Sequence, residues 1–186
     1  ETQKAIEVYS KSDSPLLLLG ETGTGKEYIA QAIHQKSSKS SLPFIKLNCA
    51  SRQMHDIQPF LFPPHKKELT SKSTNLNAKL AANTSRVIFL DNVDALTKTM
   101  QEKLINSLHP DESGKQNFLP SRLYISSSKD LNELSKQNQF DPNLLKIFKD
   151  TTIRIPSLRE NPSNIPVLIR DHLEEIAQKD GIPVPQ

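Results

Sequence analysis

Leu16-Leu17-Leu18-Leu19-Gly20-Glu21-Thr22-Gly23-Thr24-Gly25-Lys26-Glu27 is the stretch that decides the fold of this 186-residue chain. The four leucines predict a buried strand, and the turn after them has the spacing G-x-x-x-x-G-K of a phosphate-binding loop. Glycines let successive backbone N–H groups face a phosphate, Lys26 adds positive charge, and the next helix presents its N-terminus to the same anion. We therefore predict a nucleoside triphosphate site at residues 20–27.

The composition favours one α/β domain in a soluble, cytoplasmic protein. Cys49 is the only cysteine, so no disulfide framework is expected and a reducing compartment is indicated. The five histidines lack metal-ligand spacing, and no apolar run is long enough to cross a bilayer, so a membrane partner is not expected. A net charge of +3 neither requires nor excludes a nucleic-acid partner.

Four more short apolar runs predict strands that alternate with amphipathic helices. This alternation predicts a five-stranded parallel sheet covered on both faces, in three layers. Ligands of such sheets bind beyond the carboxyl ends of the strands, where the loop, Asn48, Asp91 and Ser128 fall. The predicted strands after the first are 43–48, 87–91, 122–126 and 152–155. The predicted helices are 2–11, the segment after the loop, the segment after Thr97, a short one near 76–80, and 164–179.

Three further segments, taken with the loop, resemble one family: Phe44 to Ala50, the strand that ends at Asp91, and Ile153 to Glu160. They resemble the central AAA+ ATPase domain of bacterial sigma-54-dependent transcriptional activators. The resemblance implies a P-loop NTPase fold, with residues 1–160 as the nucleotide-binding subdomain and 161–186 as the start of a truncated helical lid. It implies ATP or ADP as cofactor, with Mg²⁺ held by Asp91. Glu27, where Ser or Thr commonly binds magnesium, is this family's own variant.

The residue after Asp91 departs from the family pattern. The family has a glutamate there that polarises the attacking water, whereas this chain has Asn92. An amide does not accept a proton from water, and loss of a general base costs ~10²–10⁴-fold in rate. Asn48 matches the family residue that restrains this glutamate. The chain therefore keeps the restraining asparagine but lacks the glutamate that it restrains in the family.

Three other family positions are altered as well. Ser128 stands where the family has a sensor asparagine, and Asp141 and Ile147 stand where it has arginines that act on the neighbouring subunit. An arginine finger contributes ~10³–10⁵ in rate. The loop that contacts sigma-54 corresponds to residues 67–72, where only Thr70 of the motif G-A-F-T-G-A remains.

These losses predict a regulatory domain that binds ATP or ADP with little or no hydrolysis and does not remodel sigma-54 polymerase in the usual manner. The resemblance implies as partners other copies of the chain in a ring or dimer, RNA polymerase, and DNA through a domain outside this chain. One alternative is an active ATPase whose base is displaced to Asp94 or Glu102; we prefer Asp94 as a helix cap or first-turn carboxylate. A second is an inert scaffold, which the intact Lys26 disfavours.

Overall fold

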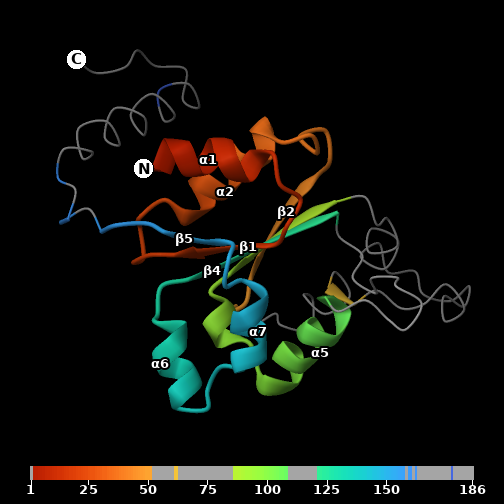
Figure 1. The fold of residues 1–186 in the computed structure, drawn as a ribbon, viewed down its shortest axis with the longest axis vertical. Coiled ribbons are helices and arrows are strands. Elements are labelled where there is room, and N and C mark those ends of the chain that lie inside the picture. Colours follow the sequence, from red (N-terminus) through yellow and green to blue (C-terminus); the bar gives the residue numbers. More distant parts are fainter. Residues whose placement is uncertain are drawn as a thin grey trace, which may run out of the picture. The chain divides into compact units, whose positions relative to one another are not determined.

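A computed structural model of the chain describes most of the strands and helices that surround the glycine-rich loop (Figure 1). The chain divides into two compact units, residues 1–155 and 156–186, and all the elements discussed below belong to the first. The described residues are 2–51, 61–62, 86–108, 121–157, 159–160, 162 and 177.

The first unit contains a five-stranded sheet in which all neighbouring strands are parallel. The strand order is β2-β3-β4-β1-β5, so β1 lies between β4 and β5 and leads into the glycine-rich loop. This arrangement confirms the predicted five-stranded parallel α/β fold. The strands are β1 Leu16–Leu19, β2 Phe44–Asn48, β3 Val87–Asp91, β4 Arg122–Ser127 and β5 Thr152–Arg154.

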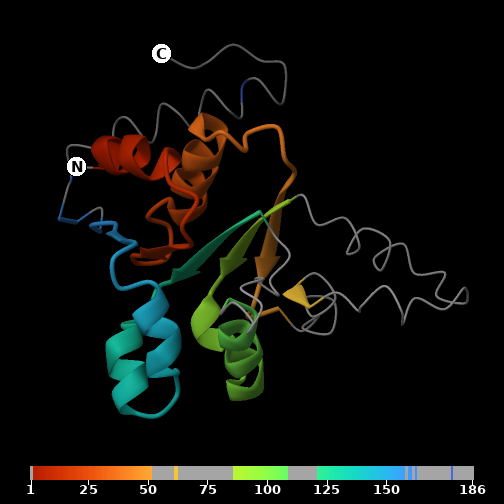
Figure 2. The ribbon, with the colours of Figure 1, turned by 45° about the vertical axis from the view of Figure 1, so that its right-hand side comes forward.

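Helices cover both faces of this sheet, which gives the predicted three layers (Figures 1 and 2). On one face lie α1 Thr2–Ser10 and α2 Lys26–Lys36. On the other lie the short 3-10 helix η1 Val93–Ala95, α5 Lys98–Leu108, α6 Leu131–Lys136 and α7 Pro142–Ile147.

The four-leucine strand is apolar throughout because it contributes to a core on each face. Successive side chains of a strand point to opposite faces, so Leu16 and Leu18 pack with α1 and α2. Leu17 packs with the core formed by η1, α5, α6 and α7. All three side chains are almost completely buried. A parallel sheet with both faces covered therefore explains why this strand lacks an alternating polar pattern.

The observed elements differ from the prediction mainly after β4. Strand β2 starts at Phe44 rather than Pro43, β4 extends to Ser127, and β5 ends at Arg154. Helices α6 and α7 were not predicted. The expected helix near 76–80, the altered sigma-54 loop at 67–72 and, apart from Ala177, the helix at 164–179 lie outside the described residues. None of the described helices is long and apolar enough to span a membrane.

Candidate nucleotide-binding site

The glycine-rich loop turns sharply between the end of β1 and the start of α2. A Cβ atom on Gly20 would lie 2.8 Å from Thr24 Oγ1 and 2.9 Å from the carbonyl oxygen of Ile155, so a larger residue does not fit there. Gly25, the residue that precedes α2, has a φ of 82°, a left-handed conformation that costs glycine little. These two glycines bring the loop backbone to the N-terminus of α2.

Lys26 lies inside this loop. Its Nζ atom donates hydrogen bonds of 2.8 Å to the carbonyl oxygens of Gly20 and Glu21. Burial lowers the pKa of Lys26, and the negative charges of Asp91 and Asp94 oppose this effect. The first N–H groups of α2 have no acceptor within the helix and point toward the same loop. The loop therefore offers oriented donors and one ammonium group to an anion, as its sequence predicts.

Asn48 and Asn92 come together at the carboxyl ends of β2 and β3. The Nδ2 atom of Asn92 donates a 3.2 Å hydrogen bond to Oδ1 of Asn48, which also accepts from the backbone N–H of Ala50 at 2.9 Å. Asn92 has φ 57° and ψ 52°, a left-handed conformation that asparagine adopts more readily than most residues. The structure thus pairs the two positions that the sequence singled out, as an amide–amide contact.

Two serines of β4 contact the acidic residues beside the loop. Ser126 Oγ donates to Asp91 Oδ1 at 2.5 Å, and Ser127 Oγ donates to Asp94 Oδ1 at 2.8 Å. The second carboxylate oxygen of Asp94 pairs with Lys129 Nζ at 2.9 Å, and the Asp94 side chain is only 6% exposed. Asp94 is a first-turn residue of η1, where Asn92 occupies the cap position. Its partners hold Asp94 in one orientation.

Ser128, the serine predicted from the sequence, is exposed, whereas Ser126 and Ser127, which were not predicted, are buried. A signal was present, because three serines in a row follow the apolar part of β4. Buried hydroxyl groups need hydrogen-bond partners, and β3, one of the two strands that neighbour β4, ends in a carboxylate. That rule points to Ser126 and Ser127 as the residues that face the acidic groups.

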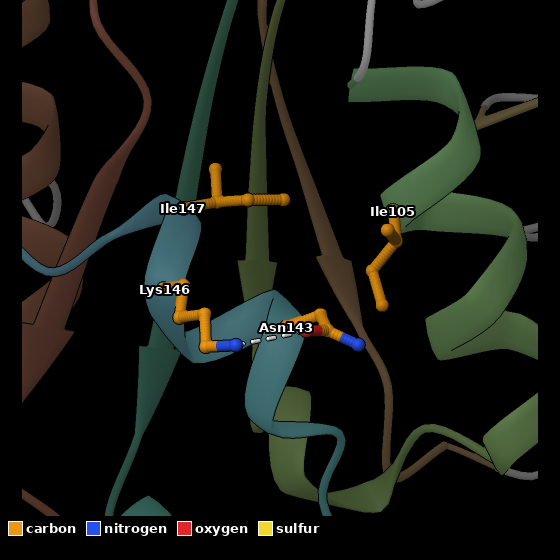
Figure 3. Close-up of a pocket in the computed structure, with 4 residues that line it drawn as sticks. All are labelled: Ile105, Asn143, Lys146 and Ile147. Carbon is orange, nitrogen blue, oxygen red and sulfur yellow. Dashed lines mark hydrogen bonds between the residues drawn. The ribbon is translucent and has the colours of Figure 1, made fainter.

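Asp141 immediately precedes α7, and Ile147 is the last residue of that helix. Asp141 caps this helix by accepting from the N–H of Asn143 at 2.8 Å. Ile147 lines a hollow of about 400 Å³ between α5 and α7 together with Ile105, Asn143 and Lys146 (Figure 3). Lys146 Nζ donates to Asn143 Oδ1 at 3.3 Å within α7, on one side of this hollow (Figure 3). Within the described part of the chain, no hydrogen bond or ion pair joins Asp141 to the glycine-rich loop.

Asp91 is suited to hold Mg²⁺ beside a bound phosphate. Its Oδ1 atom accepts from Ser126 and from the N–H of Asn92, while Oδ2 accepts no hydrogen bond from the described residues. Magnesium typically takes one or two carboxylates plus phosphate oxygens, so a single available carboxylate oxygen fits this role. Glu27 is less suited than Asp91 to bind Mg²⁺, because its Oε2 atom pairs with Lys46 Nζ at 2.5 Å.

Cys49 lies next to this site but is no nucleophile. Burial, together with the negative charges of Asp91 and Asp94, raises the pKa of its thiol to about 12. The thiol therefore stays protonated near neutral pH, and only the thiolate form is reactive.

Comparison with known proteins identifies the family. The model of the sigma-54 interaction domain matches residues 1–154. The chain belongs to the sigma-54 interaction domain family. It is 32% identical over 183 residues to a formate hydrogenlyase transcriptional activator of Salmonella typhimurium, covering 96% of this chain and 26% of that protein. The chain thus spans about a quarter of the length of this relative.

Solved structures agree on the fold. NtrX from Brucella abortus, crystallised with ATP, superimposes with a TM-score of 0.75 at 23% identity, over all of this chain and 43% of that one. The P-loop NTPase domain of a sigma-54 activator from E. coli gives a TM-score of 0.53 at 18% identity, over 78% of this chain and 99% of that one. The fold is therefore the AAA+ P-loop NTPase fold that the sequence predicted.

Proposed function

We propose that this chain is a nucleotide-binding regulatory domain of a transcriptional activator, which binds ATP or ADP at residues 20–27 and hydrolyses ATP slowly or not at all. The observation that carries the proposal is the glycine-rich loop with Lys26 at its centre. Lys26 Nζ is held by two loop carbonyl groups, which a phosphate replaces by accepting from the same ammonium. NtrX crystals with ATP and with ADP provide a precedent in the same fold.

Slow hydrolysis follows from the groups around the expected water position. Asn92 carries an amide where a general base is needed, and it is engaged with Asn48. Asp94 is a poor substitute, because Ser127 and Lys129 occupy both of its carboxylate oxygens. Asp141 and Ile147 supply no positive charge to a neighbouring subunit. Magnesium, where it binds through Asp91, supplies charge neutralisation for the phosphates.

The other parts of the proposal concern partners and location. The family description supports sigma-54 polymerase as a partner, and we expect assembly with other copies of the chain into a ring or dimer. We propose that residues 67–72, which lie outside the described residues, no longer engage sigma-54 in the usual manner. We further propose that DNA is bound by a separate domain and that the protein is cytoplasmic. Residues 161–186 would form the start of a helical lid that follows the nucleotide-binding subdomain at residues 1–160.

The alternative is an active ATPase that remodels sigma-54 polymerase with displaced catalytic residues. The family match favours it, because remodelling needs ATP turnover. Its specific requirement is a free carboxylate near the expected water position. Among the described residues, Glu102 of α5 is the other carboxylate that the sequence offered, and it is exposed rather than held by a partner in the site.

Isothermal titration of the parent and of Lys26→Ala with ATP and with ADP tests the proposal. We expect saturable binding by the parent and no detectable binding by Lys26→Ala. Lys36→Ala, at the far end of the same helix, is the matched control and should bind like the parent. Equal binding by the parent and Lys26→Ala would show that the loop is not the nucleotide site. Transcription that depends on both sigma-54 and Thr70 would overturn the part of the proposal that concerns residues 67–72.

A further inference from the structure

A second lysine, Lys129, follows the strand next to the loop, and its only role so far is as the ion-pair partner of Asp94. It follows β4 by two residues, and β4 pairs directly with β1, with Leu19 opposite Ser127. The N–H of Gly20, the first residue of the loop, donates to the carbonyl oxygen of Ser127 at 3.2 Å. The backbone of Lys129 is fixed in turn, because its N–H donates to Ser127 Oγ at 3.1 Å. The backbones of Lys129 and of Gly20, the first residue of the phosphate-binding loop, therefore both hydrogen-bond to Ser127.

Asp94 orients the side chain of Lys129. Lys129 Nζ lies 2.9 Å from Asp94 Oδ2, and the other oxygen of this carboxylate is held by Ser127. The Asp94 side chain is 6% exposed, whereas that of Lys129 is 62% exposed. The buried partner is thus the fixed one, and it holds an exposed ammonium group at the carboxyl edge of the sheet.

An ammonium group has three N–H donors, and Asp94 accepts from one side of it. Within the described ranges, Lys129 Nζ has no acceptor other than Asp94. The negative charge of Asp94 also acts on Lys26, so both lysines lie within electrostatic reach of the same carboxylate. Two ammonium groups around one buried carboxylate form an arrangement that gains favourable interactions when a polyphosphate arrives.

We propose that Lys129 is a specificity-determining residue that contacts the terminal phosphate of a bound nucleoside triphosphate, with Asp94 as its positioning residue. This inference rests on the proposed nucleotide site at residues 20–27. Lys26, inside the loop, serves the phosphates that ATP and ADP share. Lys129 sits beyond the end of β4, outside the loop, and meets the additional phosphate of ATP. The domain thereby distinguishes ATP from ADP without needing to hydrolyse either.

The test is a set of titrations with ATP and with ADP on the parent, Lys129→Ala, Lys129→Arg and Lys136→Ala. We expect Lys129→Ala to weaken ATP binding about tenfold, the lower end for a charge-assisted hydrogen bond, because the ammonium is exposed. Its ADP affinity should change by less than about twofold, as for other exposed charges. Lys129→Arg should retain the preference for ATP, since it keeps the charge.

Lys136→Ala is the matched control, because Lys136 is also an exposed lysine in an ion pair, with Glu133 on α6, so the same charge is removed elsewhere. It should leave both affinities unchanged. Equal loss of ATP and ADP binding in Lys129→Ala, or no loss of either, would overturn the inference. A lower melting temperature of Lys129→Ala with an unchanged ratio of ATP affinity to ADP affinity would also overturn the inference. It would indicate that Lys129 only stabilises the fold through its ion pair with Asp94. If the parent bound neither nucleotide, the proposed function itself would fail.

Discussion

The left-handed conformation of Asn92 allows a quantitative prediction for Asn92→Glu, the change that would restore a carboxylate after Asp91. At φ 57° and ψ 52°, a residue with an ordinary side chain is disfavoured by about 1–2 kcal/mol. The change also removes the hydrogen bond to Asn48 Oδ1, worth about 0.5–1 kcal/mol at this partly exposed site. We therefore expect the free energy of unfolding to fall by about 2 kcal/mol, which lowers the melting temperature by roughly 4–8 °C.

Urea and thermal unfolding of the parent, Asn92→Glu and Asn92→Gly measure these contributions separately. Glycine accepts the left-handed conformation but lacks the amide, so Asn92→Gly should lose only the hydrogen-bond contribution of about 0.5–1 kcal/mol. The reasoning would be refuted if Asn92→Glu were as stable as the parent, or if both variants lost the same free energy. We also expect Asn92→Glu to restore little ATP turnover, because Asp141 and Ile147 would still supply no positive charge to a neighbouring subunit.

Two further predictions concern buried polar groups. Burial lowers the pKa of His34 below its ordinary value of 6.5, and Nδ1 has no hydrogen-bond partner among the described residues. The unfolded chain therefore binds the proton more readily, so urea titrations should show stability falling below pH 6.5, with a smaller fall in His34→Gln. Gln101→Met should lower the free energy of unfolding by about 2–4 kcal/mol, because Gln101 joins Leu96, Gln139 and Asp141. The same pH dependence in His34→Gln, or a loss below 1 kcal/mol in Gln101→Met, would contradict these two accounts.

The sheet was predictable because its strands are short apolar runs that end at polar residues. Leu16 to Leu18 and Val87 to Leu90 are buried in a sheet that is covered on both faces, and Leu19 is partly buried, which leaves a continuous apolar pattern in the sequence. Helices α6 and α7 were missed because six residues are too few to show a helical period. The sequence nonetheless contains their capping residues, since an aspartate precedes each helix and Asp141 is followed by Pro142. In the structure, Asp130 accepts hydrogen bonds from the N–H groups of Asn132 and Glu133.

The candidate site could be proposed from the sequence where its residues lie in one segment, and less well where it depends on contacts between strands. Residues 20–27 carry their own signal, because glycine spacing and Lys26 belong to one turn. The contacts of Ser126 with Asp91 and of Ser127 with Asp94 join β4 to the end of β3 and to η1. Such contacts depend on the register of a parallel sheet, which a local pattern does not specify.

The central claim is that this domain binds a nucleotide without turning it over at an ordinary rate. The most direct test is phosphate release from the parent protein at a saturating ATP concentration, as established by titration of the same preparation. We predict saturable binding and a steady-state rate far below 1 s⁻¹, the low end of typical enzyme turnover numbers, which run from ~1 to 10³ s⁻¹. A rate of about 1 s⁻¹ or more that Lys26→Ala abolishes would contradict the claim and favour an active ATPase.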